Sequence, residues 1–286
     1  MPTTINKYLS LVKFSHTIFA LPFAMVGFCL AVLYENQTFT WQKLICVMLC
    51  MVFARSAAMG FNRYLDRHFD AQNPRTAMRE IPSGQISAGN ALTFVVVNCI
   101  LFIATTYFIN PLCLALSPVA LFVILFYSYT KRFTALCHIV LGIGLGLAPV
   151  GAFIAVTDYF TLLPVLLGVA VMSWTGGFDI IYALQDDEFD KGVQLHSIPA
   201  ALGRKKALLV STLLHILTAV LITAFGFLGG FSYIFWIGAV IFIGLLIYQH
   251  SIVKPDDLSR VGIAFGNTNG IASVVFAVFT IAALLL

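Results

Sequence analysis

Long apolar runs alternate with short polar connections along almost the whole chain. A transmembrane helix needs about 20 apolar residues, and each run is close to that length. The pattern predicts an all-α membrane protein, with about nine transmembrane helices forming one bundle and one domain over residues 1–286. The expected spans are residues 16–34, 41–61, 91–109, 111–130, 136–156, 160–183, 206–227, 231–249 and 262–286.

Composition excludes the soluble classes of protein. Of the 286 residues, 60% are hydrophobic and 10% are charged, whereas a soluble domain has about 25% charged residues. A water-soluble fold of this size would expose apolar surface that it could not cover. The excess of apolar residues also excludes a disordered chain. The net charge of +4 is dispersed and no basic arm occurs, which excludes a nucleic-acid partner.

The charges predict how the bundle lies in the membrane. The first run follows Lys7 and Lys13, is longer than a signal-peptide core and precedes no small-residue cleavage site, so we expect a retained first span. With nine spans, all 16 Lys and Arg residues except Lys43 fall on the side of the N-terminus. The positive-inside rule places that side in the cytoplasm. We therefore expect a multi-pass protein of the cell (inner) membrane.

The acidic residues gather on the same side. Only Glu35 and Asp158 of the 12 lie opposite, although acids contribute little to membrane orientation. Two connections on the charged side, about residues 62–90 and 184–205, are much longer than the turns on the other side. Because long loops in a compact protein usually carry function, these two loops are where we expect the chemistry.

The first long loop begins with three regularly spaced polar residues. Asn62, Asp66 and Asp70 stand at positions i, i+4 and i+8, and they share one face if the helix of the second span continues into the cytoplasm. Arg55 lies about two turns deeper on that face. An ionisable residue at such a depth in a membrane is a functional candidate.

The second long loop begins in a similar way. Asp179, Asp186 and Asp190 stand at positions i, i+7 and i+11, which again predicts one face of a helix. The separations Asp66–Asp186 and Asp70–Asp190 are both 120 residues. This shared spacing suggests two related helix–loop–helix units that face one another.

Acids and bases on one membrane face favour a magnesium–diphosphate site. Like charges four residues apart destabilise a helix, so converging carboxylates need a cation between them. Mg²⁺ takes oxygen ligands, usually a few carboxylates together with substrate phosphates. Basic side chains can balance the negative oxygens of such a phosphate. The candidates are Arg63, Arg67, Arg75, Arg79, Lys131, Arg132, Lys191 and Arg204.

Five motifs follow one another over nearly the whole chain: Asn62-x₃-Asp66-x₃-Asp70, Asn73-Pro74-Arg75-Thr76-x₂-Arg79, Pro82-Ser83-Gly84, Tyr127-x₃-Lys131-Arg132 and Asp179-x₂-Tyr182-Ala183-x₂-Asp186-x₃-Asp190. In this combination the chain resembles the UbiA superfamily of membrane-embedded aromatic prenyltransferases. The first motif of that family reads Asn-Asp-x₂-Asp-x₃-Asp. This chain has Arg63 at the second position, so Arg63 is not expected to bind metal.

The resemblance implies a cavity that faces the cytoplasm and is capped by the two loops. It implies that Asp66, Asp70, Asp186 and Asp190 are catalytic and hold Mg²⁺ on a polyprenyl diphosphate, assisted by Asn62. The prenyl tail is expected in an apolar channel that is open toward lipid.

The remaining site residues are also assigned through the resemblance. Arg55, Arg67, Lys131 and Lys191 are expected to contact the diphosphate, and Arg132 to receive the carboxylate of an aromatic acid. Ionisation of the allylic C–O bond leaves a cation that aromatic faces attract. The rings close to the motifs are Tyr127, Tyr129, Phe178 and Tyr182, and Asp179 is a candidate acceptor of the proton that the acceptor ring loses.

The implied function is Mg²⁺-dependent transfer of a polyprenyl group from polyprenyl diphosphate to 4-hydroxybenzoate in respiratory quinone biosynthesis, with release of diphosphate. An alternative keeps the chemistry and changes the acceptor. Residues 13–24 and 177–179 look similar to prenyltransferases of the futalosine route to menaquinone, where the acceptor is a dihydroxynaphthoate-type acid. The expected partners are the two substrates and the lipid bilayer, with no obligate protein partner.

Functions of other classes fit the sequence less well. A cation transporter places ionisable residues near the bilayer midplane, whereas these acids cluster at one face beside arginines. A lipid phosphotransferase with a nucleotide-alcohol donor has an Asp-x₂-Asp-Gly-x₂-Ala-Arg pattern, which the chain lacks. The six cysteines form no Cys-x₂-Cys pair and the six histidines show no zinc spacing, so both sets are expected to be structural.

Overall fold

The computed structural model describes residues 4–286, and over this range the chain forms helices and no β-strand. The α-helices are α1 (Thr4–Leu11), α2 (Leu21–Cys29), α3 (Trp41–Gln72), α4 (Ala88–Tyr107), α5 (Pro111–Thr130), α6 (Cys137–Thr157), α7 (Leu162–Ala183), α8 (Asp187–Gly192), α9 (Ile198–Leu202), α10 (Arg204–Gly229), α11 (Tyr233–Ile252) and α12 (Asn269–Leu285). Short 3₁₀ and π segments adjoin them: η1 (Phe14–Phe19), η2 (Leu30–Tyr34), η3 (Leu184–Asp186) and η4 (Ile263–Thr268).

The predicted membrane spans are confirmed. Residues 4–286 contain nine helical segments that are long and apolar enough to cross a membrane, and most of their ends lie within a few residues of the predicted ones. The second span differs, because α3 continues past residue 61 to Gln72 as one helix of 32 residues, about 48 Å long. This extension carries the whole first motif on a rigid helix, as expected.

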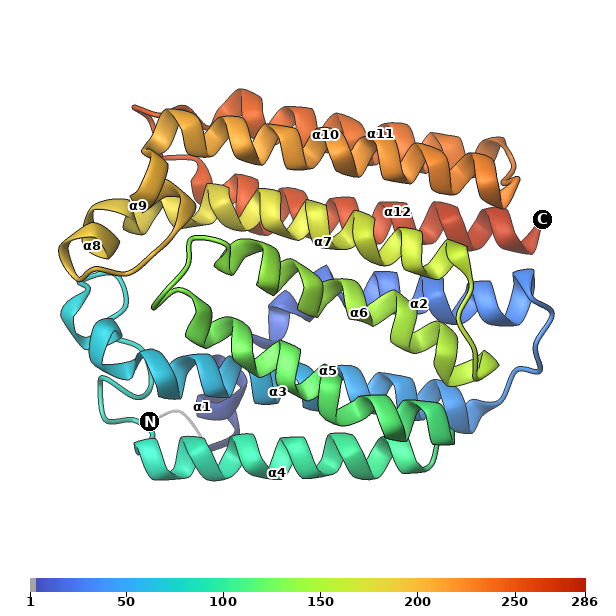
Figure 1. The fold of residues 1–286 in the computed structure, drawn as a ribbon, viewed down its shortest axis with the longest axis horizontal. Coiled ribbons are helices and arrows are strands. Elements are labelled where there is room, and N and C mark those ends of the chain that lie inside the picture. The colour runs from blue at the N-terminus through green and yellow to red at the C-terminus, as the bar shows by residue number, and fades with distance from the viewer. Residues whose placement is uncertain (1–3) are drawn as a thin grey trace.

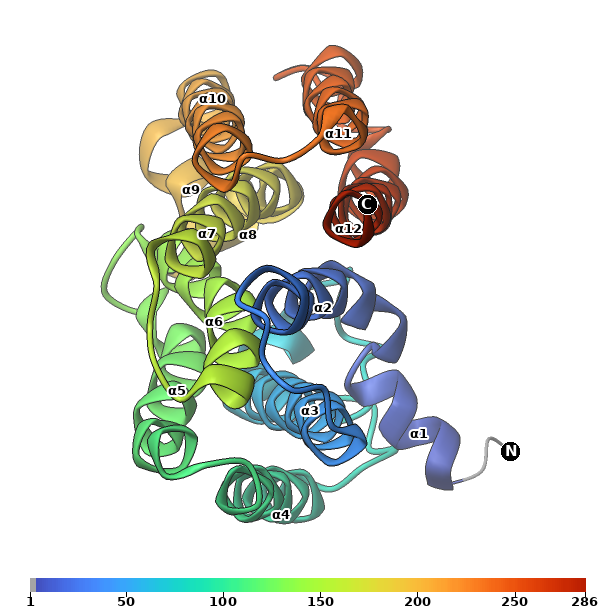
Figure 2. The same ribbon diagram turned by 90° about the vertical axis from the view of Figure 1, so that its right-hand side faces the viewer.

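The spans are layered around a central group of helices. Helices α3, α4 and α5 pack together at one side of the bundle and α10, α11 and α12 at the other, with α2, α6 and α7 between them (Figure 2). The buried rings of Phe23, Trp174, Phe242 and Phe276 contact one another where α2 and α7 of the middle group meet α11 and α12. The outward faces keep large exposed apolar side chains, as expected for surfaces in contact with lipid.

Helices α6 and α7 approach one another very closely. A Cβ atom at Gly142 would stand 2.3 Å from the carbonyl oxygen of Met172, and one at Gly146 would stand 2.4 Å from that of Gly168. Small residues allow the backbones of membrane helices to come together. The contact fixes α7, whose last turns carry the second motif.

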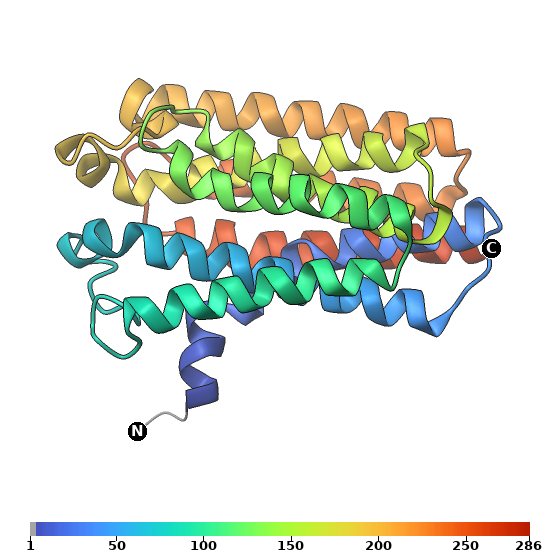
Figure 3. The same ribbon diagram turned by 60° about the horizontal axis from the view of Figure 1, so that its bottom comes forward.

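Both long loops lie at the same end of the bundle. The connection over residues 73–87 lies next to η3, α8 and α9, whereas the C-terminus lies at the opposite end (Figure 1). Helix α1 leaves the side of the bundle near the loop end (Figure 3). The hydroxyl of Ser10 on α1 donates a hydrogen bond to the carboxylate of Glu80 in the first loop. The two loops therefore face one another, as the repeated spacing suggested.

The second motif departs from the predicted continuous helix. Helix α7 ends at Ala183, and the 3₁₀ segment η3 precedes α8, so Asp179, Asp186 and Asp190 are not on one face of a single helix. The reason lies in Asp187, which is buried and accepts two hydrogen bonds from Arg204, at 3.0 and 2.9 Å. The acids of this segment then occupy the first turn of α8, where the helix dipole favours negative charge.

Candidate active site

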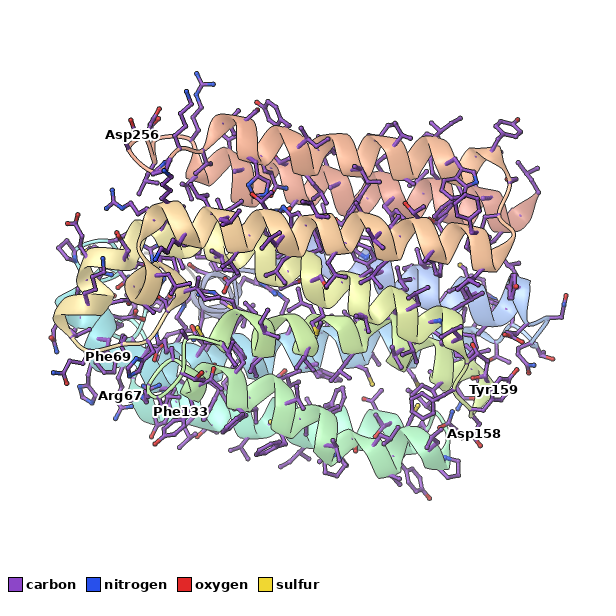
Figure 4. The ribbon with its side chains drawn as sticks, turned by 45° about the horizontal axis from the view of Figure 1, so that its top comes forward. Arg67, Phe69, Phe133, Asp158, Tyr159 and Asp256 are labelled. Carbon is purple, nitrogen blue, oxygen red and sulfur yellow. The ribbon has the colours of Figure 1, made fainter. Side chains whose placement is uncertain are left out.

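A cavity of about 600 Å³ lies between the helices at the loop end of the bundle. Its wall is made by α3 from Arg55 onward, by the start of α6, by the end of α7 and by both loops. Phe69 belongs to this wall, and Figure 4 shows it near Arg67 and Phe133, at the end of the bundle opposite Asp158. On α3 the wall residues recur every three or four positions, which is one face of a helix.

Most of the predicted site residues line this cavity. They are Arg55, Asn62, Asp66, Asp70, Lys131, Asp179, Tyr182, Asp186 and Asp190. Three others do not belong to the described wall. Arg67 lies over the ring of Tyr64, 4.6 Å from its centroid, and donates to the Tyr64 carbonyl oxygen. Lys191 is half exposed and stands 3.9 Å from Asp187, and Arg132 approaches Asp66 from outside the wall.

Asp66 is surrounded by donors. Lys131 Nζ lies 2.7 Å from its Oδ2, Arg132 Nη2 lies 3.1 Å from its Oδ1, and Asn62 Nδ2 donates to Oδ2 over 3.1 Å. Arg132 also donates to the carbonyl oxygens of Leu65 and Ser128. The guanidinium of Arg132 therefore ties the end of α5 to α3 and holds Asp66 in place.

Asp70 keeps one oxygen without a partner. Arg79 Nη1 lies 2.7 Å from Asp70 Oδ1, and the Thr76 hydroxyl donates to the Asp70 carbonyl oxygen over 3.0 Å. The second carboxylate oxygen, Oδ2, is buried and has no hydrogen-bond partner among residues 4–286. A buried carboxylate oxygen in this state is costly unless a cation or a donor binds there.

The two motifs are joined through Asp186. Arg75 in the first loop forms an ion pair with Asp186, and Asn73 Nδ2 donates to the same carboxylate over 2.9 Å. Arg75 Nη1 also donates to the hydroxyl of Tyr182, 2.9 Å away. Burial lowers the pKa of the Arg75 guanidinium, but the hydrogen bonds and charge interactions with Asp186 and Tyr182 together outweigh that effect and raise the pKa above its ordinary value. Arg75 therefore stays charged and connects the loops.

Asp179 is held differently from the other acids. Its Oδ2 lies 2.7 Å from His138 Nδ1, and no Lys or Arg of the described chain forms an ion pair with it. The backbone N–H of Ile198 donates to His138 Nε2 over 3.3 Å, so the ring proton that faces Asp179 is on Nδ1. The carboxylate of Asp179 therefore accepts a hydrogen bond from Nδ1 of the His138 ring.

The donor set fits Mg²⁺. Within residues 4–286 no three His, Cys, Asp or Glu side chains are grouped closely enough to hold a metal by themselves. Mg²⁺ usually takes one or two carboxylates and fills its remaining positions with water and substrate phosphate oxygens. Asp66, Asp70, Asp186 and Asp190 supply such carboxylates on one wall, and Asp70 Oδ2 lacks a partner. The set suits a metal that arrives with a diphosphate.

A second cavity of about 340 Å³ adjoins the first within the membrane-spanning part. Apolar side chains of α3, α4, α5 and α6 make most of its wall. Five residues line both cavities, which shows that they are neighbours: Arg55, Met59, Tyr127, Leu141 and Leu145. A charged chamber thus lies next to an apolar one, which is a suitable pair of spaces for a ligand with an ionic head and a hydrocarbon tail.

Sequence reasoning missed part of the wall. His138 was expected to be structural, and nothing in its spacing points to Asp179. Asn73 and Arg75 stand in the tail of the first motif, but their contact with Asp186 depends on the packing of the two loops. Arg63 was expected only as one of several basic side chains that could balance a phosphate and not as a metal ligand, and its burial in the cavity wall was not foreseen.

The family of the chain follows from its sequence and its fold. Residues 20–285 match the UbiA prenyltransferase family. The 4-hydroxybenzoate octaprenyltransferase of Paraburkholderia phymatum is 30% identical over 234 residues, which is 82% of this chain and 81% of the relative. That of Burkholderia ambifaria is 31% identical over 237 residues, 83% of this chain and 81% of the relative.

Solved structures agree with this result. The apo structure of a UbiA homologue from Aeropyrum pernix K1 is 30% identical, covers 94% of this chain and 97% of its own, and has a TM-score of 0.81. A UbiA homologue from Archaeoglobus fulgidus bound to GPP and Mg²⁺ has a TM-score of 0.73 at 20% identity, with 98% of this chain and all (100%) of the homologue covered.

Proposed function

We propose, since the chain belongs to the UbiA prenyltransferase family, that it transfers a polyprenyl group from a polyprenyl diphosphate to an aromatic acid and releases diphosphate. The first-choice acceptor is 4-hydroxybenzoate, in respiratory quinone biosynthesis. Relatives about 30% identical over most of both chains are named as 4-hydroxybenzoate octaprenyltransferases, which supports this choice of acceptor.

One observation carries the proposal. The acids of both motifs line a single charged cavity, and this cavity adjoins an apolar one. A prenyl diphosphate has the same two parts, an anionic head and a long hydrocarbon tail. With the head near the motif acids, the tail lies between α3, α5 and α6. A tail too long for about 340 Å³ continues into the lipid.

The diphosphate is bound through Mg²⁺ and through basic side chains. Asp66, Asp70, Asp186 and Asp190 hold the metal, which when bound stabilises negative charge on the departing diphosphate. Homologues of the same fold have been solved with prenyl diphosphates and Mg²⁺, which supports this assignment. Lys131, Arg75 and Arg79 already lie beside these acids, where their positive charges would balance the phosphate oxygens.

The reaction proceeds through charge separation at the allylic carbon. The C–O bond breaks with its electron pair on the diphosphate, and the allylic cation lies against the aromatic rings of the wall. Tyr127, from the end of α5, and Phe178 and Tyr182, from the end of α7, line the cavity. The acceptor ring then forms the new C–C bond with its π electrons, which leaves one proton to be removed from the attacked carbon.

Asp179 takes this proton. Its carboxylate lies in the cavity wall and is oriented by the Nδ1–H of His138. The electron pair of the broken C–H bond restores the aromatic ring, and the proton leaves to water after product release. His138 acts as a positioning residue, because its other nitrogen is occupied by the backbone N–H of Ile198.

The acceptor is tested by analysis of the lipid products. Membranes that contain the chain are supplied with a polyprenyl diphosphate, Mg²⁺ and either 4-hydroxybenzoate or a dihydroxynaphthoate-type acid, and prenylated products are identified by mass spectrometry. We expect prenylated 4-hydroxybenzoate. If only the dihydroxynaphthoate-type acid is prenylated, the chain belongs to the menaquinone alternative. Metal flux in proteoliposomes without any prenylated product would identify a transporter instead.

A further inference from the structure

The guanidinium of Arg63 is buried in the wall of the charged cavity. The residue is 6% exposed, and its Nε atom is inaccessible and has no hydrogen-bond partner among residues 4–286. Arg63 belongs to α3, between the first two polar residues of the first motif. A positive charge in this state is costly unless an anion accompanies it.

The acids nearest to Arg63 are bound to other groups. Asp66 forms ion pairs with Lys131 and Arg132. The Oδ1 atom of Asp70 forms an ion pair with Arg79. Glu80 accepts a hydrogen bond from Ser10. Asp70 and Glu80 attract Arg63 at longer range, but neither forms an ion pair with it in the described chain. The protein itself thus supplies no close anion for Arg63.

Arg55 stands in a similar state on the same wall. It lies eight residues before Arg63, two turns and about 12 Å deeper along α3, and its Nε is also buried without a partner in the described chain. Its Nη2 reaches only the Lys13 carbonyl oxygen, 3.5 Å away. The two guanidiniums repel one another, and both side chains are long enough to converge on an anion between them.

We infer that Arg63 and Arg55 form the binding site for the carboxylate of the aromatic acceptor. The inference rests on the proposed function and names the recognition element of its second substrate. It replaces the sequence-based assignment of this carboxylate to Arg132, which is occupied by backbone oxygens and by Asp66. It also replaces the sequence-based assignment of Arg55 to the diphosphate. Planar guanidinium groups bind carboxylates with paired hydrogen bonds.

Position separates this site from that of the diphosphate. The bases beside the motif acids are Lys131, Arg75 and Arg79, whereas Arg55 also lines the apolar cavity. An anion between Arg63 and Arg55 is therefore further inside than the motif acids and has apolar side chains around it. An aryl carboxylate has this composition, with one charged group on a flat hydrocarbon ring. A magnesium diphosphate does not.

The test compares acceptors that differ only in charge. Arg63→Gln is assayed with 4-hydroxybenzoate and with 4-hydroxybenzamide at saturating prenyl diphosphate, and Arg260→Gln, an exposed residue of the loop before η4, is the matched control. Hydrogen bonds to charged groups contribute enough to predict a loss of tenfold or more in kcat/KM for the acid. We expect little loss of kcat/KM for the amide. The KM for prenyl diphosphate and the strength of inhibition by inorganic pyrophosphate should both stay unchanged.

The other outcomes are distinct. If Arg63→Gln raises the KM for prenyl diphosphate and leaves the preference for acid over amide unchanged, the site belongs to the diphosphate and the inference is wrong. If the unsubstituted protein prenylates neither acceptor, nor the naphthoate acid and its amide, the proposed function fails instead. Should Arg63→Gln not fold, Arg63→Lys keeps the charge but loses the paired geometry, and an unchanged acid preference there would also contradict the inference.

Discussion

At the scale of single residues, the acids of the cavity differ in what holds them. Asp66 and Asp186 contact cationic side chains, which hold both carboxylates in position before any metal binds. Asp179 contacts the imidazole of His138 instead, and no Lys or Arg of the described chain forms an ion pair with it. A carboxylate whose oxygens are not tied up by Lys or Arg is accessible to a proton from the substrate, which suits a general base. The different partners therefore separate metal-binding acids from the acid that deprotonates the ring.

Asp179→Asn tests the role of the base. We expect kcat to fall by about 10²–10⁴-fold, the range in which a positioned base contributes, with little change in the KM values of both substrates. Proton removal then becomes the slow step, so a ring-deuterated acceptor reveals a primary isotope effect that is larger than that of the unsubstituted protein.

His138→Gln tests how that base is oriented. The substituted amide can still donate to Asp179, so a smaller loss of kcat is expected than for Asp179→Asn, again with an increased isotope effect. An isotope effect that stays at the original value in both variants would contradict the assignment of Asp179, even if the rate fell.

At the scale of elements, the position of the second motif depends on the close crossing of α6 and α7. Gly142→Ala forces a Cβ against the Met172 carbonyl oxygen, and overpacking of this kind costs about 1–3 kcal/mol. Gly144→Ala is the matched control on the same helix, because its Cβ would meet Ile124 at an ordinary 3.4 Å. Thermal unfolding in detergent should show a lower Tm for Gly142→Ala only. Equal Tm values would contradict the close crossing.

The sequence predicts the helices of this protein better than it predicts the contacts between them. The lengths of the apolar runs were enough to predict the nine spans. The four-residue spacing of Asn62, Asp66 and Asp70 was enough to predict that they share one face of α3. Both features depend on local helix geometry. The break at η3 could not be predicted, since it depends on Arg204 binding Asp187 across the second loop. The contact of His138 with Asp179 likewise joins two helices whose relative position is a result of packing.

At the scale of the whole molecule, the charged end and the apolar middle define how the protein sits in a bilayer. We propose that the loop end faces the cytoplasm, because nearly all Lys and Arg residues lie there. This places the cavity mouth where water-soluble aromatic acids and Mg²⁺ are available, while the apolar cavity lies at membrane depth beside the lipid.

Cysteine labelling tests this orientation. The exposed Thr38 belongs to the connection between η2 and α3, which lies at the end of the bundle that holds the C-terminus (Figure 1). The exposed Asp256 lies at the other end (Figure 4), and neither residue lines a cavity described above. In intact cells a membrane-impermeant maleimide should label Thr38→Cys, while Asp256→Cys should react only after permeabilisation. The reverse pattern would place the cavity on the outer side.

The central claim is that carboxylates of both motifs act together on one magnesium-bound diphosphate. Its most direct test is the rate of diphosphate release against Mg²⁺ concentration for Asp66→Asn, Asp186→Asn and the double variant, with the exposed Asp256→Asn as control. We predict that each single change lowers the rate by at least 100-fold and that the double change adds little, because residues acting as one unit are not additive. Near-normal, Mg²⁺-dependent release in both single variants would contradict the account.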